Sequence, residues 1–135
     1  MIRRTNILEE DISIPKKIWF LWLQGLSRAP DIVRSCYQSW EKHNPEWELN
    51  ILDENNLEYY VNIKSIVCDN YSTITPQALS DIVRINLLNK YGGVWVDATC
   101  YCCKPLNSWL PQYSTAGFFA FDLFKPGKDR LISSF

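Results

Sequence analysis

The chain has 135 residues, of which 47% are hydrophobic and 14% aromatic, and its formal net charge is −1. We expect one domain over residues 1–135, because this length allows a single core and this composition excludes a disordered chain. The charge pattern offers no basic surface for nucleic acid, and no apolar run is long enough to cross a membrane. The charged residues 1–11 indicate a flexible N-terminal segment rather than a signal peptide.

The first half of the chain predicts a strand, a helix and a second strand. Residues 18–23, IWFLWL, form a continuous apolar run typical of a central strand that is covered on both faces. Residues 24–30 form a loop, which places Trp22 at the carboxyl end of the strand. Apolar residues at helical spacing follow from residue 32, and Asn44-Pro45 ends that helix. Residues 47–51 alternate between apolar and polar side chains, so we expect a second strand with one less buried face.

The next region leads to the most strongly patterned stretch of the chain. Residues 54–60 predict a short helix and residues 61–74 irregular structure. Thr75 can cap a helix that begins at Pro76, and an apolar stripe continues to Tyr91. Gly92-Gly93 ends that helix, and residues 94–96, VWV, favour a buried strand that is followed by Asp97.

The last region predicts a turn at residues 109–111, a strand at 117–121 and a surface turn at 125–128. The complete order of strand, helix, strand, helix and strand predicts an α/β fold with a mostly parallel sheet and helices on its faces.

Three polar residues are candidates for a ligand site. Asp97 closes an apolar strand, where a carboxylate is costly to desolvate unless it lies at the mouth of the sheet, which is where ligands bind in open α/β sheets. Asp81 and Arg84 are spaced i,i+3, so both can project from one side of the preceding helix towards the same mouth. By spacing alone, a surface ion pair is the favoured explanation of these two residues.

Two motifs resemble those of a known enzyme family. Ser80-Asp81-x-x-Arg84 and then Tyr91-Gly92-Gly93-Val94-Trp95-Val96-Asp97 resemble the sugar-nucleotide-binding core of the capsular polysaccharide synthesis proteins and of glycosyltransferase family 32. The resemblance takes in residues 14–19 with Trp22, Ser39-Trp40 with Asn44-Pro45, and residues 129–134, so it covers roughly residues 12–135. It implies a GT-A fold, a Rossmann-type sandwich with an Asp-x-Asp motif. Because that fold normally continues further, we expect a truncated, partial domain.

The resemblance also implies roles for single residues. Trp22 would stack on the nucleotide base, with UDP favoured, Asp81 and Arg84 would contact the donor sugar, and Asp97 would contact the ribose, the sugar or a metal. The divalent cation, Mn²⁺ or Mg²⁺, is held by two carboxylates in relatives, because residues i and i+2 of a strand point to one side. Here the motif reads Asp97-Ala98-Thr99, so Thr99 would be a weaker, neutral ligand.

The implied activity is that of a hexosyltransferase-type glycosyltransferase. It would transfer a sugar from a nucleotide diphosphate to a surface (capsular) polysaccharide or its lipid-linked precursor, with retention of configuration. The lack of a membrane-spanning run and of a signal peptide predicts a cytoplasmic protein. We also expect a bacterial source and a peripheral association with the inner face of the cell membrane. The alternative is a non-catalytic sugar-nucleotide-binding or structural α/β module.

The cysteines do not predict a separate metal site. Five cysteines without the spacing of a disulfide framework indicate reduced thiols. Cys100, Cys102 and Cys103 lack the second pair of a zinc site, so we expect these thiols to be packing residues.

Overall fold

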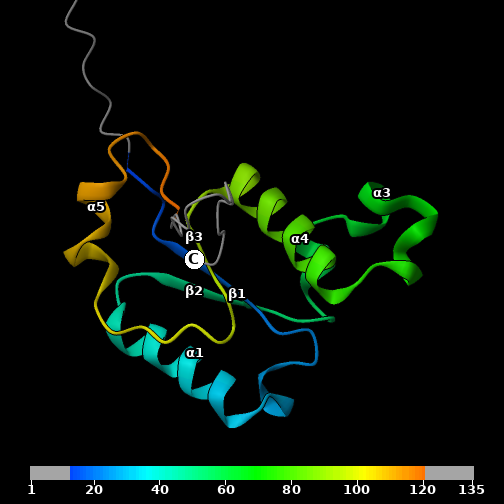
Figure 1. Cartoon of the computed structure of the whole chain (residues 1–135), viewed down its shortest axis with the longest axis horizontal. Helices are drawn as coiled ribbons and strands as arrows, with labels where there is room; N and C mark the ends of the chain where they lie inside the picture. The colour runs from blue at the N-terminus through cyan, green and yellow to red at the C-terminus, as the bar shows by residue number, and fades with distance from the viewer. Residues whose placement is uncertain (1–12, 121–135) are drawn as a thin grey trace, which may run out of the picture.

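The computed structural model describes residues 13–120, apart from the side chains of residues 69–71, and shows an α/β fold. Three parallel strands lie in the order β2-β1-β3, with β1 at Lys17–Leu21, β2 at Glu48–Leu52 and β3 at Val94–Val96. Figure 1 shows α1 (Asp31–His43) on one side of the sheet and α4 (Pro76–Tyr91) on the other. The predicted parallel sheet with flanking helices is therefore confirmed, as are both long helices.

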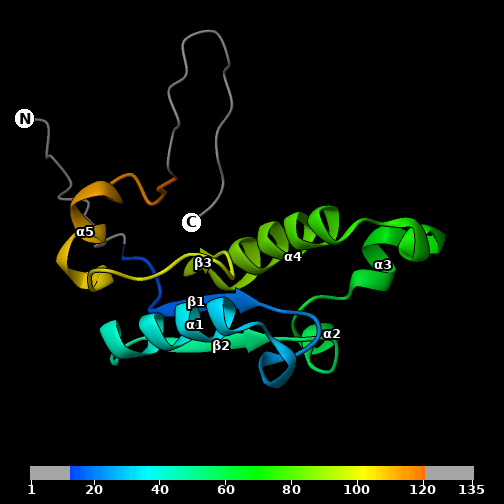
Figure 2. The ribbon, with the colours of Figure 1, turned by 60° about the horizontal axis from the view of Figure 1, so that its bottom comes forward.

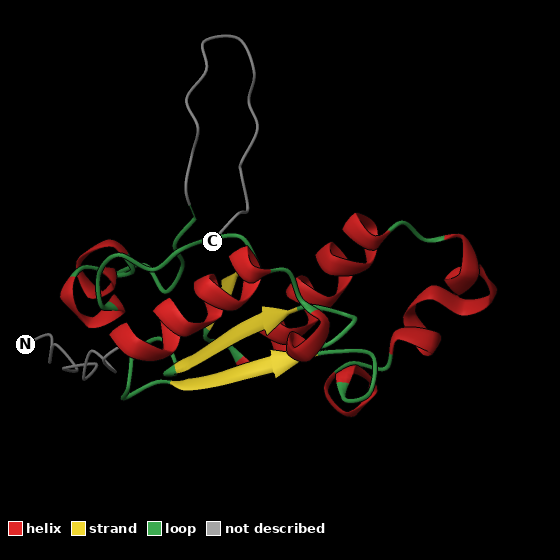
Figure 3. Cartoon of the chain, turned by 90° about the horizontal axis from the view of Figure 1, so that it is seen from below, coloured by secondary structure: helices red, strands yellow, loops and turns green. Residues whose placement is uncertain are grey.

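The central strand β1 fixes the register of the sheet. Phe20 lies opposite Ile51 of β2 and opposite Val96 of β3. The strands therefore end at one common edge, and the two yellow arrows at the front of Figure 3 point the same way. Residues that follow the strands are brought together at this carboxyl edge.

Two apolar layers hold the helices on the sheet. On the α1 face, the buried core residues include Ile18, Phe20, Val33, Trp40, Val96 and Leu106. On the α4 face, α4 and the short helix α2 (Leu57–Tyr60) contribute to a second layer, whose buried residues include Trp19, Leu52, Leu57, Val83, Leu87 and Trp95. The alternation along β1 sends Ile18 and Phe20 to one face and Trp19 to the other, as the pleat of a strand requires.

The junction between α4 and β3 follows the sequence prediction. Thr75 Oγ1 accepts a hydrogen bond of 3.2 Å from the backbone N–H of Ala78, and Pro76 is the first helical residue. Gly92 and Gly93 end the helix with φ of +67° and +95°. A Cβ on Gly93 would lie 2.5 Å from the carbonyl oxygen of Lys17, so only glycine lets the chain pass this close to β1.

Three predictions for local structure differ from the structure within the described residues. In the first, the predicted turn at residues 109–111, the chain turns at Trp109 and then begins a short helix at Leu110. Residues 61–74 contain helix α3 (Ile63–Val67) and a 3-10 helix (Cys68–Thr73), not irregular structure. The side chain of Asn62 caps α3 through the backbone N–H of Ser65, and a helix of one turn is too short to show periodicity. Figure 2 shows α3 projecting beyond the sheet, at the opposite end of the molecule from α5 (Leu110–Tyr113).

Residues 117–120 do not form the predicted strand. Phe119 instead packs against Trp109, with 5.5 Å between the ring centroids, and the ring contact takes the place of strand pairing. The end of that predicted strand at residue 121, the flexible start at residues 1–11, the turn at 125–128 and the matching residues 129–134 lie outside the described residues. Within residues 13–120, none of the helices has the length and apolar character that a membrane span needs.

Candidate functional site

The carboxyl edge of the sheet brings two of the predicted residues close together in the backbone. Trp22 follows β1, and Asp97 follows β3, which is the neighbour of β1. Because Phe20 pairs with Val96, Asp97 lies level with Leu21, one residue before Trp22. Neighbouring strands are about 4.8 Å apart, so the two backbones meet at the mouth of the sheet.

Asp97 lies in a turn, which corrects part of the sequence prediction. The backbone N–H of Cys100 donates a hydrogen bond of 2.9 Å to the carbonyl oxygen of Asp97, so residues 97–100 turn directly after β3. The Asp97 carboxylate is anchored from the sheet, because Trp95 Nε1 donates to its Oδ1 over 3.0 Å. Trp95 belongs to the α4 face, so the carboxylate is tied to that side of the edge.

The turn alters the expectation for a metal ion. Asp97 and Thr99 were expected to share one side of an extended strand, but the strand ends at Val96 and Thr99 is exposed. The carboxylate of Asp97 suits Mg²⁺ or Mn²⁺, whereas the structure does not place Thr99 beside it as a strand partner. Among the side chains that the structure describes, no three or more His, Cys, Asp or Glu residues form a group that could hold a metal ion.

Trp22 lies on the other face of the same edge. Its side chain is half-buried and packs against the apolar layer on the α1 face. Its Nε1 is buried and has no hydrogen-bond partner, the only such side-chain nitrogen or oxygen found among the described residues. A buried donor without a partner costs about 1–3 kcal/mol, so the position of the Trp22 indole lowers the stability of the fold by about that amount. Trp22 and the Asp97 carboxylate therefore flank the edge from opposite faces.

Asp81 and Arg84 form an ion pair on α4. The Arg84 guanidinium donates to Asp81 Oδ1, and the exposed fraction is 60% for the Asp81 side chain against 14% for the Arg84 side chain. Helix α4 runs back towards the start of β3 (Figure 2), rising about 1.5 Å per residue, and β3 advances about 3.3 Å per residue. Counted from the turn at Gly92, Arg84 and Asp97 therefore reach similar heights along the sheet.

A second carboxylate at this edge was missed by the sequence analysis. Asp53 follows β2, and its Oδ1 accepts hydrogen bonds from the backbone N–H groups of Asn55, at 2.8 Å, and Asn56, at 3.3 Å. Its Oδ2 faces Gly25, where a Cβ would lie 3.6 Å away. The sequence pattern that singled out Asp97 also applies to Asp53, because each aspartate directly follows a strand. Its turn contacts show one clear role, which is to shape the loop beside Trp22.

Of the three thiols expected to be packing residues, Cys102 is buried and Cys100 is half-buried, whereas Cys103 is exposed, so the prediction is wrong for Cys103. Cys36 is also buried, and all five cysteines are free. Burial, and after it the negative charge of Asp97, raises the pKa of the Cys100 thiol. Burial also raises the pKa of Cys102. Neutral thiols at physiological pH fit packing residues rather than metal ligands.

Comparison with known proteins decides the family. Residues 3–135 match the family described as "Capsular polysaccharide synthesis protein". The chain belongs to this family. The sequence resemblance to capsular polysaccharide synthesis proteins is therefore confirmed. The match covers all of residues 13–120, which the structure describes, and extends to residues 3 and 135 on either side.

Relatives of this family member are named glycosyltransferases. The chain is 26% identical over 143 residues to O-glycosyltransferase braB of Annulohypoxylon truncatum, covering 92% of the chain and 34% of that protein. It is 30% identical over 104 residues to glycosyltransferase afumC of Aspergillus fumigatus, covering 69% of the chain and 27% of that protein. It is 25% identical over 134 residues to the initiation-specific alpha-1,6-mannosyltransferase of Saccharomyces cerevisiae, covering 90% of the chain and 28% of that protein.

The chain thus spans about a third of the length of these relatives, or less. No solved structure is significantly similar to it. The three relatives are fungal proteins, so the bacterial source implied by the sequence resemblance stays a prediction.

Proposed function

We propose that the chain is the donor-binding part of a glycosyltransferase that moves a hexose from a nucleotide diphosphate to a saccharide acceptor. The observation that carries this proposal is that Trp22 and Asp97 each follow one of two neighbouring parallel strands at the carboxyl edge of the sheet, at a height similar to that of Arg84 on α4. Membership of the capsular polysaccharide synthesis family, and relatives that are named glycosyltransferases, support it.

Each part of a sugar nucleotide would meet a suitable side chain. Trp22 would offer a ring to the base, and a UDP-sugar is the donor that the family resemblance favours. Asp81 would accept hydrogen bonds from sugar hydroxyls while Arg84, which already holds the Asp81 carboxylate, donates to them. Asp97 would accept from the ribose or the sugar through the carboxylate that Trp95 orients. Such fixed contacts place the reacting carbon and the acceptor in the geometry that transfer requires.

The leaving diphosphate needs positive charge as the glycosidic bond breaks. A divalent cation, Mn²⁺ or Mg²⁺, would supply that charge, with Asp97 as its protein ligand and Thr99 as a secondary one if the turn at residues 97–100 rearranges. Arg84 is a candidate cation on α4 that could share that task. We propose retention of configuration, which would rely on orientation and charge stabilisation.

The acceptor and location follow from the family alone. We propose a surface (capsular) polysaccharide, or its lipid-linked precursor, as the acceptor. We also propose a cytoplasmic location, from which a lipid-linked acceptor would bring the protein to the inner face of the cell membrane by peripheral association.

A thermal-shift screen tests the donor proposal. A ligand that binds the folded chain at 100 times its Kd stabilises it by about 2.7 kcal/mol, which is readily measured. We expect UDP-sugars to raise the melting temperature, and to raise it further when Mn²⁺ is present. The screen also includes a mannose-bearing nucleotide, because the yeast relative is named a mannosyltransferase. The screen overturns the proposal if no nucleotide sugar stabilises the chain at millimolar concentration.

A second measurement separates transfer from binding. Release of free nucleotide from a labelled donor, with a saccharide acceptor present, would indicate an enzyme. Stabilisation by the donor without nucleotide release would instead favour the non-catalytic sugar-nucleotide-binding alternative for this chain.

A further inference from the structure

The chain leaves the candidate site through a segment that is neither helix nor strand until a 3-10 helix (Leu106–Ser108) begins at its last residue. Residues 100–106, here called the return segment, run from the turn at Asp97 back along α1 towards α5 (yellow in Figure 1). Cys102 and Leu106 in this segment are buried, with exposed fractions of 3% and 0%. Because no ladder of backbone hydrogen bonds serves the segment, its buried N–H groups need acceptors from side chains.

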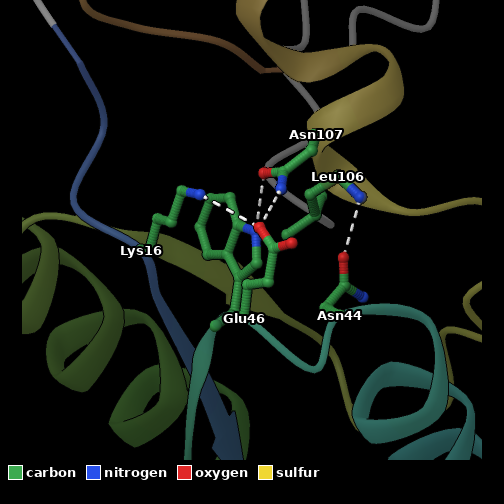
Figure 4. Close-up of polar contacts among 6 residues, drawn as sticks. Lys16, Asn44, Glu46, Leu106 and Asn107 are labelled. Carbon is green, nitrogen blue, oxygen red and sulfur yellow. Dashed lines mark hydrogen bonds and ion pairs between the residues drawn. The ribbon is translucent and has the colours of Figure 1, made fainter.

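Helix α1 and the residue that caps its C-terminus, Asn44, supply those acceptors. Ser39 Oγ accepts a hydrogen bond of 2.8 Å from the backbone N–H of Cys102. Asn44 Oδ1 accepts one of 2.8 Å from the backbone N–H of Leu106 (Figure 4). Ser39 and Asn44 are 3% and 4% exposed, and a buried polar group costs free energy unless it is hydrogen-bonded. Both side chains therefore serve the return segment directly.

A third contact reaches the residue that closes the Asp97 turn. Trp40 Nε1 donates a hydrogen bond of 2.7 Å to the carbonyl oxygen of Cys100. The N–H of the same Cys100 donates to the carbonyl oxygen of Asp97 over 2.9 Å. Two consecutive hydrogen bonds thus connect an almost fully buried indole of α1 to the backbone of Asp97.

The carboxylate of Asp97 is thereby fixed from two directions. Trp95, on the rigid strand β3, holds its Oδ1, and the Trp40–Cys100 contact holds the turn that sets its backbone angles. We propose that Trp40 is a positioning residue for Asp97, supported by Ser39 and Asn44 along the return segment. The effect of Trp40 on donor affinity rests on the proposed function, whereas the effect of Trp40 on the position of the Asp97 carboxylate does not.

The far end of the return segment offers a matched control. Trp47 Nε1 donates a hydrogen bond of 2.9 Å to Asn107 Oδ1, and Asn107 Nδ2 donates to Glu46 Oε2 over 2.9 Å. Figure 4 shows Lys16 also reaching Glu46, at 3.3 Å. Trp47→Phe therefore deletes the same kind of indole hydrogen bond as Trp40→Phe, but away from Asp97.

The indole Nε1–H of Trp95 is a direct reporter of the Asp97 carboxylate, because that carboxylate is its acceptor. We would record indole ¹H–¹⁵N spectra of the whole chain for the native protein, Trp40→Phe and Trp47→Phe. Trp40→Phe should move the Trp95 signal and speed its exchange with solvent, and Trp47→Phe should leave both unchanged. A Trp95 signal that stays in place in Trp40→Phe, or that moves equally in both variants, overturns the proposal.

Ser39→Ala guards against the case in which Trp40→Phe does not fold. It removes the acceptor of Cys102 and keeps the indole, so a displaced Trp95 signal in this variant supports the positioning inference, and an unmoved signal overturns it.

Donor affinity then tests whether the positioning matters for binding. If Trp40 acts through Asp97, Trp40→Phe should weaken donor binding in the native background and add no further loss in Asp97→Asn, whereas a general structural effect would cost the same in both. Equal losses in both backgrounds overturn the link. If the native chain binds no donor at all, the proposed function fails, and the Trp95 signal still decides whether Trp40 positions Asp97.

Discussion

Trp95 and Asp97 are joined by a hydrogen bond of 3.0 Å, from the indole Nε1 to the carboxylate Oδ1. Trp95 is 2% exposed and belongs to the core of the α4 face, whereas Asp97 lies at the edge of the sheet. The bond therefore makes a rigid core residue the support of a carboxylate that faces the candidate site. It also links the stability of β3 to the geometry of that site.

Replacing Asp97 by asparagine should remove the charge and keep the fold. The amide oxygen of asparagine can still accept the hydrogen bond from Trp95, so the free energy of unfolding should change little. A charged hydrogen bond contributes about 2 kcal/mol, so donor affinity should fall about 30-fold. Calorimetric titration measures this, with Glu48→Gln as a control, because Glu48 begins β2 at the opposite edge and pairs with Lys17. Unchanged affinity in Asp97→Asn would contradict the role given to Asp97.

The Asp81–Arg84 pair should recognise the sugar rather than the nucleotide. Asp81→Ala and Arg84→Ala are each expected to weaken binding of a nucleotide sugar by about tenfold and to leave the nucleotide alone nearly unaffected, as the loss of about 1–1.5 kcal/mol per hydrogen bond predicts. The Asp31–Arg34 pair of α1 has the same i,i+3 spacing, so Asp31→Ala is the matched control. Equal losses for both ligands would count against this assignment.

Trp22 and Trp19 should respond differently to the same substitution. Trp22→Phe removes a buried donor that has no partner, and this gain offsets the lost volume, so the free energy of unfolding should change by less than about 1 kcal/mol. Trp19→Phe deletes a hydrogen bond of 2.9 Å to the carbonyl oxygen of Gly92 and should cost about 1–3 kcal/mol beyond packing. Urea unfolding measures both. A larger loss in Trp22→Phe would show that its indole N–H has a partner in solution.

Two glycines separate steric overlap from backbone strain. Gly93→Ala should cost more than about 3 kcal/mol, because the new Cβ would lie 2.5 Å from the Lys17 carbonyl and φ is +95°. Gly25→Ala has a positive φ of +81° but an approach no closer than 3.6 Å, so strain alone should cost about 1–2 kcal/mol. Comparable unfolding midpoints for the two variants would contradict the tight packing of the α4–β3 turn on β1.

Stability should fall in alkaline solution because of the buried thiols. Burial raises the pKa of Cys36 and Cys102 above the ordinary 9.0. Above about pH 9 the unfolded chain loses protons that the folded chain keeps, so the free energy of unfolding decreases as pH rises through this range and is unaffected below it. Urea midpoints at pH 7.5 and 10 test this.

The control for that measurement is Cys36→Ala, which should reduce the alkaline loss. Tyr37 adds to the loss in the same direction, since burial and then Glu41 raise its pKa above 10.0, and Tyr37→Phe isolates that contribution. A stability that rises between the two pH values would be the opposite result.

Much of the architecture was determined by the sequence because its signals are local. The Thr75-Pro76 start, the apolar stripe and Gly92-Gly93 specify α4 within a few residues, and continuous apolar runs specify β1 and β3. These signals depend on backbone preferences and burial that act over one or two turns, so no distant contact is needed to read them. The same local logic placed Trp22 and Asp97 at strand ends.

Only the tertiary structure decided how those residues are held. The turn at residues 97–100 replaced the expected extended strand, because the return segment is drawn onto α1 by Trp40, Ser39 and Asn44, which lie more than fifty residues away in the chain. No periodicity in the sequence records such side-chain-to-backbone bonds. The register that sets Asp97 level with Leu21, one residue before Trp22, depends on which strands become neighbours, and this follows from long-range packing rather than from local preference. The bond from Trp95 to the Asp97 carboxylate likewise forms only in the folded structure.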